Sequence, residues 1–345
     1  MFKNLSLFQK VVFFFNCIAV VLLSAACFVP YISSERYAFL AFLSLGVPFL
    51  VIVNFLFFLF WLFQKKRQML FSFLILVIGY FSLGAFIKVG LGESEAAADD
   101  LKVMSYNVRV FNKFGEMASP NVFDDIKAFV DEEKPDVICF QEVDYVRQKE
   151  YEDYPYRYLE YIHKQDKVLL GIFSKYPIVS TELLDFPGSP NEAACADILY
   201  KNDTIRIYNM HLQSLGITHT RANSILDQQK SKRILKKMTE AFGKQQQQAK
   251  LVKEHMQANS YPQILCGDFN NSQFSNAYKT IRGEKYDSFI EEGFGYGRTL
   301  NYHRFPVRID FILSDPVFEV KSHKTYDVKY SDHYPVMASF KLGAH

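Results

Sequence analysis

The stretch Gln263-Ile-Leu-Cys-Gly-Asp-Phe-Asn-Asn271 decides the fold class of this chain. Its first half is a short apolar run of the kind that forms a strand buried on both faces, and Pro262 directly precedes that strand. Polar residues follow at once, at Asp268 and Asn270. Enzymes built on a sheet place reactive side chains at such strand ends, so this stretch predicts a buried sheet with a site at its edge.

The same pattern of short apolar runs and amphipathic stretches continues on both sides of this segment. It predicts a helix at 122–133, closed by Pro135, and a longer one from about 220 to 257 with a break at Gly243. The polar run Gln245–Gln248 in the long helix is expected on a solvated face. Strands are expected at 101–108, 136–142, 168–173, 196–200, 204–211, 263–266, 308–313 and 336–340, with a hairpin turning at Asn202-Asp203. Mixed strands and helices of this kind imply an α/β sandwich.

The amino-terminal part has a different composition. Three stretches, at about 11–31, 37–63 and 69–89, are apolar over the roughly 20 residues that a helix needs to cross a bilayer. Short links join them, so we expect residues 1–92 to form a membrane anchor of three transmembrane helices. A small, acidic linker at 93–100 then leads to a catalytic domain at 101–345. A cleaved signal peptide is the alternative for the first stretch, but the two later spans would still hold the chain in the membrane.

The formal net charge changes sign at the same boundary. Residues 1–92 carry seven basic and one acidic side chain, or +6, which leaves 32 basic and 36 acidic residues, or −4, for the rest of the chain. The net-acidic part lacks the broad basic footprint of a tight, non-specific nucleic-acid binder. Five scattered cysteines exclude a disulfide framework.

Polar residues stand at the ends of several predicted strands. Taken singly, each is most simply a cap or a turn former. Asp310 is harder to explain in that way, because a carboxylate between apolar strand residues is costly unless it is paired or functional. The ordered set comprises Ser105-Tyr-Asn107, Gln141-Glu142, Asn209-Met-His211-Leu, Gly267-Asp-Phe-Asn-Asn271, Arg308-Ile-Asp310-Phe and Ser331-Asp-His-Tyr-Pro-Val336.

This set, in this order, resembles the endonuclease/exonuclease/phosphatase superfamily, which includes pancreatic-type deoxyribonucleases, AP endonucleases, neutral sphingomyelinases and inositol polyphosphate phosphatases. The resemblance covers 101–342 and implies a four-layer α/β sandwich of two mixed β-sheets flanked by helices. It departs from the AP-endonuclease branch, because Tyr106-Asn-Val-Arg-Val110 and Pro306-Val-Arg-Ile-Asp310 lack the tryptophans typical of that branch. A role in DNA repair is therefore not expected.

The resemblance also implies the chemistry. Hydrolysis of a phosphoester, with phosphodiesters favoured, needs a divalent ion, an activated water and donors to the phosphoryl oxygens. Hard oxygen ligands suit Mg²⁺ or Mn²⁺. The implied metal set is Asn107, Glu142 and Asp332, and the implied catalytic set is His211, Asp268, Asn270, Asp310 and His333. In these sets Asp268 activates the water, and Asn270, His211 and His333 bind the phosphate, with His333 steered by Asp310 or Asp332.

Three readings of function remain open on the sequence. The first is a membrane-anchored nuclease or phosphatase, whose substrate is nucleic acid or another phosphoester. The second is a sphingomyelinase-like lipid phosphodiesterase that takes a phospholipid headgroup, which the membrane location and the missing basic footprint favour. The third is a non-catalytic binding module, which the intact set of motif residues argues against. No protein partner can be inferred.

The distribution of positive charge predicts how the anchor lies in the cell membrane. Cytoplasmic flanks of membrane spans are enriched in lysine and arginine. Lys3 and Lys10 precede the first span and Lys65-Lys66-Arg67 links the second to the third, whereas Arg36 in the first link is cancelled by Glu35. We therefore expect a cytoplasmic amino terminus and, after three spans through the lipid bilayer, a catalytic domain on the extracytoplasmic side.

Overall fold

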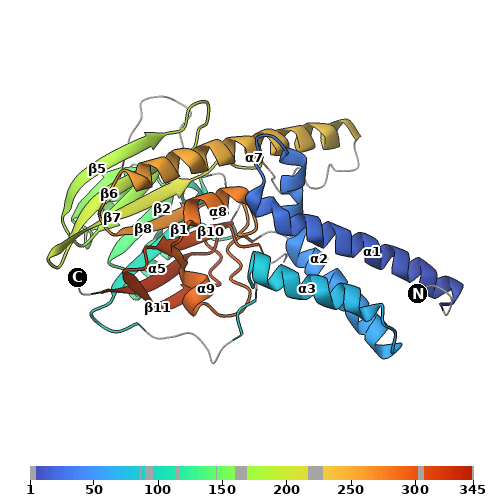
Figure 1. Ribbon diagram of the computed structural model, residues 1–345. Coiled ribbons are helices and arrows are strands. Elements are labelled where there is room, and N and C mark those ends of the chain that lie inside the picture. The colour runs from blue at the N-terminus through green and yellow to red at the C-terminus, as the bar shows by residue number, and fades with distance from the viewer. Residues whose placement is uncertain are drawn as a thin grey trace.

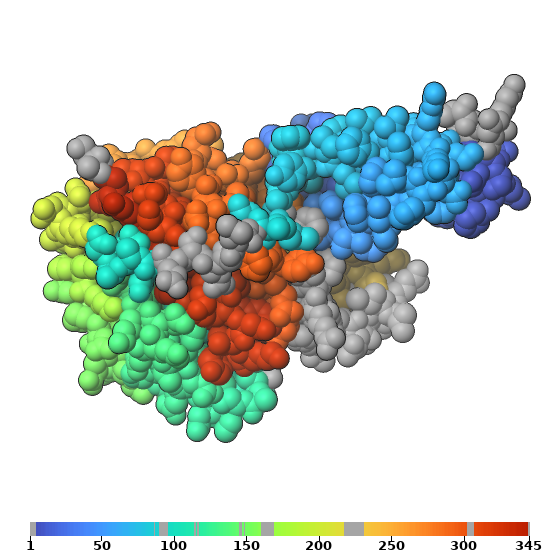
Figure 2. Space-filling view, turned by 90° about the horizontal axis from the view of Figure 1, so that it is seen from below, coloured from blue at the N-terminus to red at the C-terminus, as the bar shows by residue number. Residues whose placement is uncertain are grey.

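The computed structural model of the protein describes residues 5–85, 87–89, 96–113, 115, 117–144, 146–159, 169–216, 228–301 and 307–343. Helices from the first 83 residues project from one side of an α/β domain (Figure 1). The view from below shows the same separation, with the helices at one end and the domain at the other (Figure 2).

Two six-stranded sheets form the domain. The first has the order β11-β12-β1-β2-β4-β3, made of Phe318–Thr325, Val336–Leu342, Leu101–Asn107, Val137–Gln141, Leu170–Ser174 and Tyr156–Leu159. The second has the order β5-β6-β7-β8-β10-β9, made of Ile178–Asp185, Glu192–Tyr200, Asp203–His211, Gln263–Asp268, Asp310–Ser314 and Tyr286–Asp287. The pairs β1–β2 and β7–β8 are parallel and the others antiparallel, so both sheets are mixed, as predicted.

Three buried apolar clusters define the layers. Between the sheets, Val103 and Ile172 of the first sheet pack with Ile207 and Ile264 of the second. On the outer face of the first sheet lies α5 (Val122–Glu133), which has the predicted bounds. On the outer face of the second sheet lie α7 (Gln228–Gln257) and α8 (Asn276–Arg282). The order is helix, sheet, sheet, helix, which confirms the predicted α/β sandwich.

Two local expectations are wrong. The β6–β7 hairpin turns at Lys201-Asn202, one residue earlier than expected, because Tyr200 pairs with Asp203 and Lys201 takes the left-handed conformation with φ 55°. The long helix has no break at Gly243, since α7 runs unbroken from Gln228 to Gln257. The expected beginning of that helix, at 220–227, lies outside the described residues.

The run Gln245–Gln248 is buried rather than solvated, apart from Gln247. Nε2 of Gln245 donates to the carbonyl oxygens of Gln213 and Asn270, at 2.7 and 3.1 Å. Oε1 of Gln248 accepts from the backbone N–H of Gln213 at 2.8 Å. Gln245 and Gln248 thus face loops of the domain, whereas Gln246 faces the bundle, where its Oε1 accepts from the backbone N–H of Glu35 at 3.1 Å.

The amino-terminal helices are α1 (Leu7–Phe28), α2 (Ala38–Phe63) and α3 (Met69–Leu83). Only two segments among the described residues, Leu7–Tyr31 and Ala38–Phe63, are long and apolar enough to cross a membrane. The predicted third span at 69–89 is wrong, because α3 ends at Leu83, where Gly84 takes φ 78°. Its 15 residues reach about 22 Å at 1.5 Å per residue, short of a bilayer core of roughly 30 Å.

A chain of buried side-chain hydrogen bonds joins the three helices. Nε1 of Trp61 on α2 donates to Oδ1 of Asn16 on α1 at 3.0 Å, and Nδ2 of Asn16 donates to Oγ of Ser72 on α3 at 2.6 Å. The outward faces of the bundle are apolar instead, with exposed side chains such as Phe14, Phe49 and Phe81. The bundle therefore has hydrogen-bonded polar side chains inside and an apolar outer surface.

Hydrogen bonds join the bundle to residues 272–276 of the domain, in addition to its contacts with α7 and Gly295. Oγ of Ser272 donates to the carbonyl oxygen of Ser44 on α2 at 3.0 Å. Nδ2 of Asn276 donates to the carbonyl oxygen of Pro30, in the turn after α1, at 2.8 Å. Nε2 of Gln273 donates to the carbonyl oxygen of Ala85, just after α3, at 3.0 Å. Backbone carbonyls of α2 and of the segments that follow α1 and α3 thus contact residues 272–276, shortly after Asn270.

Candidate active site

Strand ends from both sheets converge on Asp268, the last residue of β8. In the second sheet Asp268 is the register partner of His211 on β7 and of Asp310 on β10. Asn107, at the end of β1, crosses from the first sheet and donates from Nδ2 to Oδ2 of Asp268 at 3.1 Å. Four of the predicted residues therefore meet at the edge where the two sheets come together.

Asp268 is buried and surrounded by donors. The backbone N–H of Asn270 donates to its Oδ1 at 2.7 Å, and Nδ2 of Asn270 lies 3.3 Å from its Oδ2. The Nε2 atoms of His211 and His333 lie 3.5 and 3.6 Å from the same Oδ2. Burial raises the pKa of Asp268 to about 6, against the lowering influence of His333. Its carboxylate is ionised near neutral pH and poised to take up a proton.

His333 is held by Asp310. Its Nδ1 lies 2.9 Å from Oδ2 and 3.1 Å from Oδ1 of that carboxylate. Burial by itself would lower the pKa of His333, but the charges of Asp310 and Asp268 outweigh it and the pKa stands well above its ordinary value. A protonated imidazole between two carboxylates is therefore the expected state at neutral pH.

A second acidic group lies at the rim. Oε2 of Glu142 and Oδ2 of Asp332 each lie 3.8 Å from the guanidinium of Arg109, so a cation already sits between two carboxylates. Such oxygen donors fit a hard divalent ion such as Mg²⁺. Asn107 turns its nitrogen toward Glu142, with Nδ2 3.2 Å from Oε1, while its Oδ1 accepts from the backbone N–H of Arg109 at 3.1 Å. The two carboxylates are therefore the stronger candidates for metal ligands. Asn107 could coordinate the ion only through the remaining lone pair of its Oδ1.

Backbone strain is concentrated at these positions. Arg109, Glu142 and Asn270 have φ of 49°, 51° and 48°, in the left-handed region that costs a non-glycine residue about 1–3 kcal/mol. Gly267 has φ 147°, and a Cβ there would lie 2.0 Å from the carbonyl oxygen of Met210. Only glycine lets β8 approach β7 this closely, which brings Asp268 beside His211.

A cavity of about 270 Å³ opens onto the site. Six of the eight predicted residues line it, namely Glu142, His211, Asp268, Asn270, Asp332 and His333. The other two, Asn107 and Asp310, lie behind the wall, hydrogen-bonded to residues that line it. Nδ1 of His211 is buried with no hydrogen-bond partner among the described residues.

Two motif residues tie the sheets together and do not line the cavity. Nε2 of Gln141 donates to Oδ1 of Asn209 at 2.7 Å. Nδ2 of Asn209 in turn donates to the carbonyl oxygens of Phe140 and Gly171, at 2.8 and 3.0 Å. These contacts fix the first sheet against the second and so set the separation of Asn107 and Asp268.

Residues that the sequence did not indicate also line the cavity. Arg109 carries no signal beyond its place two residues after Asn107, since its role depends on the left-handed turn. Leu45 and Pro48 come from α2, far away in the sequence and inside an apolar span. No strand-end pattern could indicate them.

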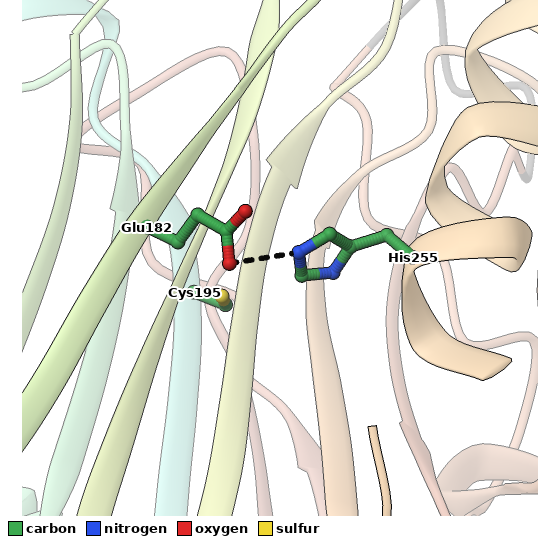
Figure 3. A group of neighbouring side chains, drawn as sticks. All are labelled: Glu182, Cys195 and His255. Atoms are coloured by element: carbon green, nitrogen blue, oxygen red, sulfur yellow. Dashed lines mark ion pairs between the residues drawn. The ribbon is translucent and has the colours of Figure 1, made fainter. Parts of the chain in front are cut away.

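A second group with potential metal ligands lies outside the cavity (Figure 3). Glu182 on β5, Cys195 on β6 and His255 on α7 point toward one another. Nε2 of His255 lies 3.0 Å from Oε2 of Glu182, and its Nδ1 lies 2.9 Å from the Tyr208 hydroxyl oxygen. Burial raises the pKa of the Cys195 thiol to about 12, so the thiol is protonated. Protein groups engage both ring nitrogens, and the cluster is explained as a contact between α7 and the sheet.

Comparison with known proteins agrees with this geometry. A family model described as the endonuclease/exonuclease/phosphatase family matches residues 104–333. A second model, described as a domain of unknown function (DUF8431), matches residues 9–86, the helical bundle. No curated protein matches the chain significantly.

Solved structures share the fold of the domain. They include a mannosyl-6-phosphatase of Bacteroides thetaiotaomicron, at 20% identity and TM-score 0.53 over 70% of this chain and 100% of that one. TDP2 of D. rerio, complexed with a single-strand DNA product, is 15% identical with TM-score 0.53 over 70% and 99%. The human Nocturnin catalytic domain, with a bound sulfate, is 13% identical with TM-score 0.54 over 72% and 96%. Identities this low establish a common fold and leave the substrate open.

Proposed function

Because the chain belongs to the endonuclease/exonuclease/phosphatase family of phosphoester hydrolases, we propose that it is a metal-dependent hydrolase that cleaves a phosphoester, with phosphodiesters favoured, by in-line attack of water. The observation that carries the proposal is the position of Asp268. It is a buried carboxylate ringed by Asn107, Asn270, His211 and His333, and it opens onto a cavity that also exposes Glu142 and Asp332.

Each residue has a distinct role in this proposal. Asp268 orients the attacking water and accepts its proton, for which a carboxylate with a pKa near 6 is suited. His333, held by Asp310, donates to the phosphoryl group and then to the leaving oxygen.

The opposite wall and the rim complete the set. Nδ2 of Asn270 and Nε2 of His211 reach the phosphoryl oxygens from the side opposite His333. Glu142 and Asp332, with the Asn107 oxygen, would hold Mg²⁺ or Mn²⁺, which neutralises charge on the phosphoryl oxygens. With a divalent ion held by these two carboxylates, the guanidinium of Arg109 would be available to bind the phosphate.

We propose further that the helical bundle anchors the enzyme in a membrane. The two long apolar segments and the exposed phenylalanines on the bundle support this placement. The antiparallel helices put Lys10 and the basic link 65–67 at the end away from the domain. By the positive-inside rule that end is cytoplasmic, and the catalytic domain, at the opposite end of the bundle, lies on the other side.

The test is a substrate screen with the full chain in lipid nanodiscs. Bis-p-nitrophenyl phosphate, p-nitrophenyl phosphate, DNA, RNA, sphingomyelin and phosphoinositides are each assayed with Mg²⁺, with Mn²⁺ and with EDTA. Turnover of at least one phosphoester with metal, and none with EDTA, is expected. Absence of turnover on every substrate, in a folded protein that binds Mg²⁺ by calorimetry, would favour the non-catalytic binding module instead.

A further inference from the structure

The anchor contributes a wall to the catalytic cavity. Leu45 and Pro48 of α2 line the same cavity as Asp268 and His333. This part of α2 is fixed in place, because the Ser44 carbonyl accepts from Ser272 at 3.0 Å and Oγ of Ser44 donates to Oδ1 of Asn271 at 3.3 Å. The site as a whole is therefore built from both the domain and the bundle.

The wall beside α2 is apolar. Arg308 also lines the cavity, but Asp287 at 2.8 Å and Gln273 hold its guanidinium. A sugar or a nucleotide would find few hydrogen-bond partners on such a wall, whereas an alkyl chain gains roughly 25 cal/mol for each Å² of apolar surface buried. The apolar lining residues are Leu45, Pro48, Leu215, Phe274, Leu300 and Val307.

This apolar wall continues into the core of the bundle. Phe274 lines the cavity and also packs with Leu23, Val47 and Ile75, which come from α1, α2 and α3. These four side chains are at most 4% exposed, so the apolar wall is backed by the packed core of the bundle. An alkyl chain in the cavity would therefore lie against Leu45, Pro48 and Phe274, which the core of the bundle holds in place.

The cavity mouth carries exposed aromatic residues at the base of the anchor. Tyr296 lines the cavity and is 56% exposed, and Phe294 is 51% exposed. Gly295 between them pairs with Lys88 through two backbone hydrogen bonds of 2.9 Å, directly after the segment that leaves α3. With the bundle in a bilayer, these two rings lie at its surface, where tyrosine and other amphipathic rings are stable.

We propose that the substrate is a phosphoester lipid of the bilayer that holds the enzyme, an inference that rests on the proposed function. The phosphate lies at Asp268, Asn270 and His333, and an alkyl chain lies against Leu45 and Pro48. Water forms a bond to phosphorus, the P–O bond to the lipid alcohol breaks, and a proton passes to the leaving oxygen. The products are a lipid alcohol that stays in the bilayer and a soluble phosphate ester.

The charge of the domain favours a lipid over a nucleic acid. Residues 93–345 carry a formal charge of −4. At the cavity rim the guanidinium of Arg109 lies between two carboxylates. A polyanion with many phosphates needs a basic track beyond the cleaved bond, whereas a lipid presents one phosphate at a time.

The experiment uses the full chain reconstituted in vesicles of dioleoyl phosphatidylcholine, phosphatidylethanolamine, phosphatidylglycerol and sphingomyelin with Mg²⁺. Mass spectrometry measures the diacylglycerol and ceramide formed. The same protein is assayed on water-soluble dibutyryl forms of the glycerophospholipids and on bis-p-nitrophenyl phosphate. The variants are Leu45→Ser in the wall, Tyr296→Ala at the mouth, and Phe39→Ser, a 68% exposed position on α2 outside the cavity, as a control.

We expect lipid turnover with a preference for the dioleoyl over the dibutyryl form of one headgroup. Leu45→Ser and Tyr296→Ala should each lower that preference by about tenfold, and Phe39→Ser should leave it unchanged. Turnover of bis-p-nitrophenyl phosphate without lipid turnover would overturn the inference and leave the proposed function standing. Lipid turnover with an unchanged preference in both variants would also overturn it. Inactivity on every phosphoester would overturn the proposed function itself.

Discussion

Asp268 and Asp310 face each other directly across the antiparallel pair β8–β10, so that two buried carboxylates lie side by side. Such a pair is stable only if a cation lies close to it. His333 meets this need, with Nδ1 2.9 Å from Asp310 and Nε2 3.6 Å from Asp268. The structure thereby makes one carboxylate a support for the imidazole and leaves the other facing the cavity.

Metal affinity should depend on Glu142. Glu142→Gln removes one of the two carboxylates at the rim, so we expect the Mg²⁺ concentration for half-maximal activity to rise by about ten- to a hundredfold, with part of the rate recovered at high Mg²⁺. Magnesium titration of the hydrolysis rate measures this. Glu319→Gln, at a 63% exposed side chain on β11, serves as the control. An unchanged half-saturation in Glu142→Gln would remove Glu142 from the metal set.

Gln245 should matter for stability far more than its neighbour Gln247. Gln245→Ala leaves the carbonyl oxygens of Gln213 and Asn270 and the Asn271 amide without their partner, at a cost of about 2–3 kcal/mol. Gln247 is exposed, so Gln247→Ala should change stability by less than about 0.5 kcal/mol. Denaturant unfolding followed by circular dichroism compares the two. Equal effects would mean that the Gln245 contacts do not hold α7 to the site.

Acid should destabilise the fold through His323. Burial lowers the pKa of His323 from 6.5 to about 3. Between pH 6.5 and pH 3 the imidazole is therefore neutral in the folded state and protonated in the unfolded state. Each pH unit below about 6.5 should therefore cost about 1.4 kcal/mol of unfolding free energy from this residue, down to about pH 3. In His323→Gln the glutamine amide can still donate to Ser288, and this share of the pH slope should disappear. Identical slopes between pH 7 and 5 in both proteins would show that His323 is not the cause.

Orientation in the membrane can be measured with reporter fusions. After residue 98, alkaline phosphatase should be active and green fluorescent protein dark, because the domain is placed outside the cytoplasm. After residue 66 the pattern should be reversed, since the basic link is placed in the cytoplasm. A fluorescent fusion after residue 98 would move the enzyme to the cytoplasm.

The site residues that the sequence indicated share one feature. Asn107, Glu142, His211 and Asp268 each follow a buried apolar run, and the sheet edge brings such positions together whatever the details of the loops. The apolar runs also indicated an α/β sandwich, whereas the order of the strands in each sheet came from the structure. Local periodicity predicts a strand or helix correctly where the burial of its residues depends only on packing within the domain.

The features that the sequence missed depend on tertiary contacts between segments far apart in the chain. Gln245 belongs to a polar run that is typical of a solvated helix face, but its amide is buried against Gln213, Asn270 and Asn271. Residues 84–89 read as the end of a membrane span, but Gly84 ends α3 and Lys88 pairs with Gly295. Arg109 needs a left-handed turn that no composition signal marks. Each miss arises where tertiary contacts override a local pattern.

The central claim is that Asp268 drives a metal-dependent hydrolysis of a phosphoester. The most direct measurement is the Mg²⁺-dependent rate of full-length Asp268→Asn on the best substrate of the screen, compared with wild type and with Asp131→Asn, a partly exposed position on α5. The account predicts a loss of about a thousandfold in kcat for Asp268→Asn, at unchanged Mg²⁺ binding, and none for Asp131→Asn. A folded Asp268→Asn protein with a rate within tenfold of wild type would contradict it.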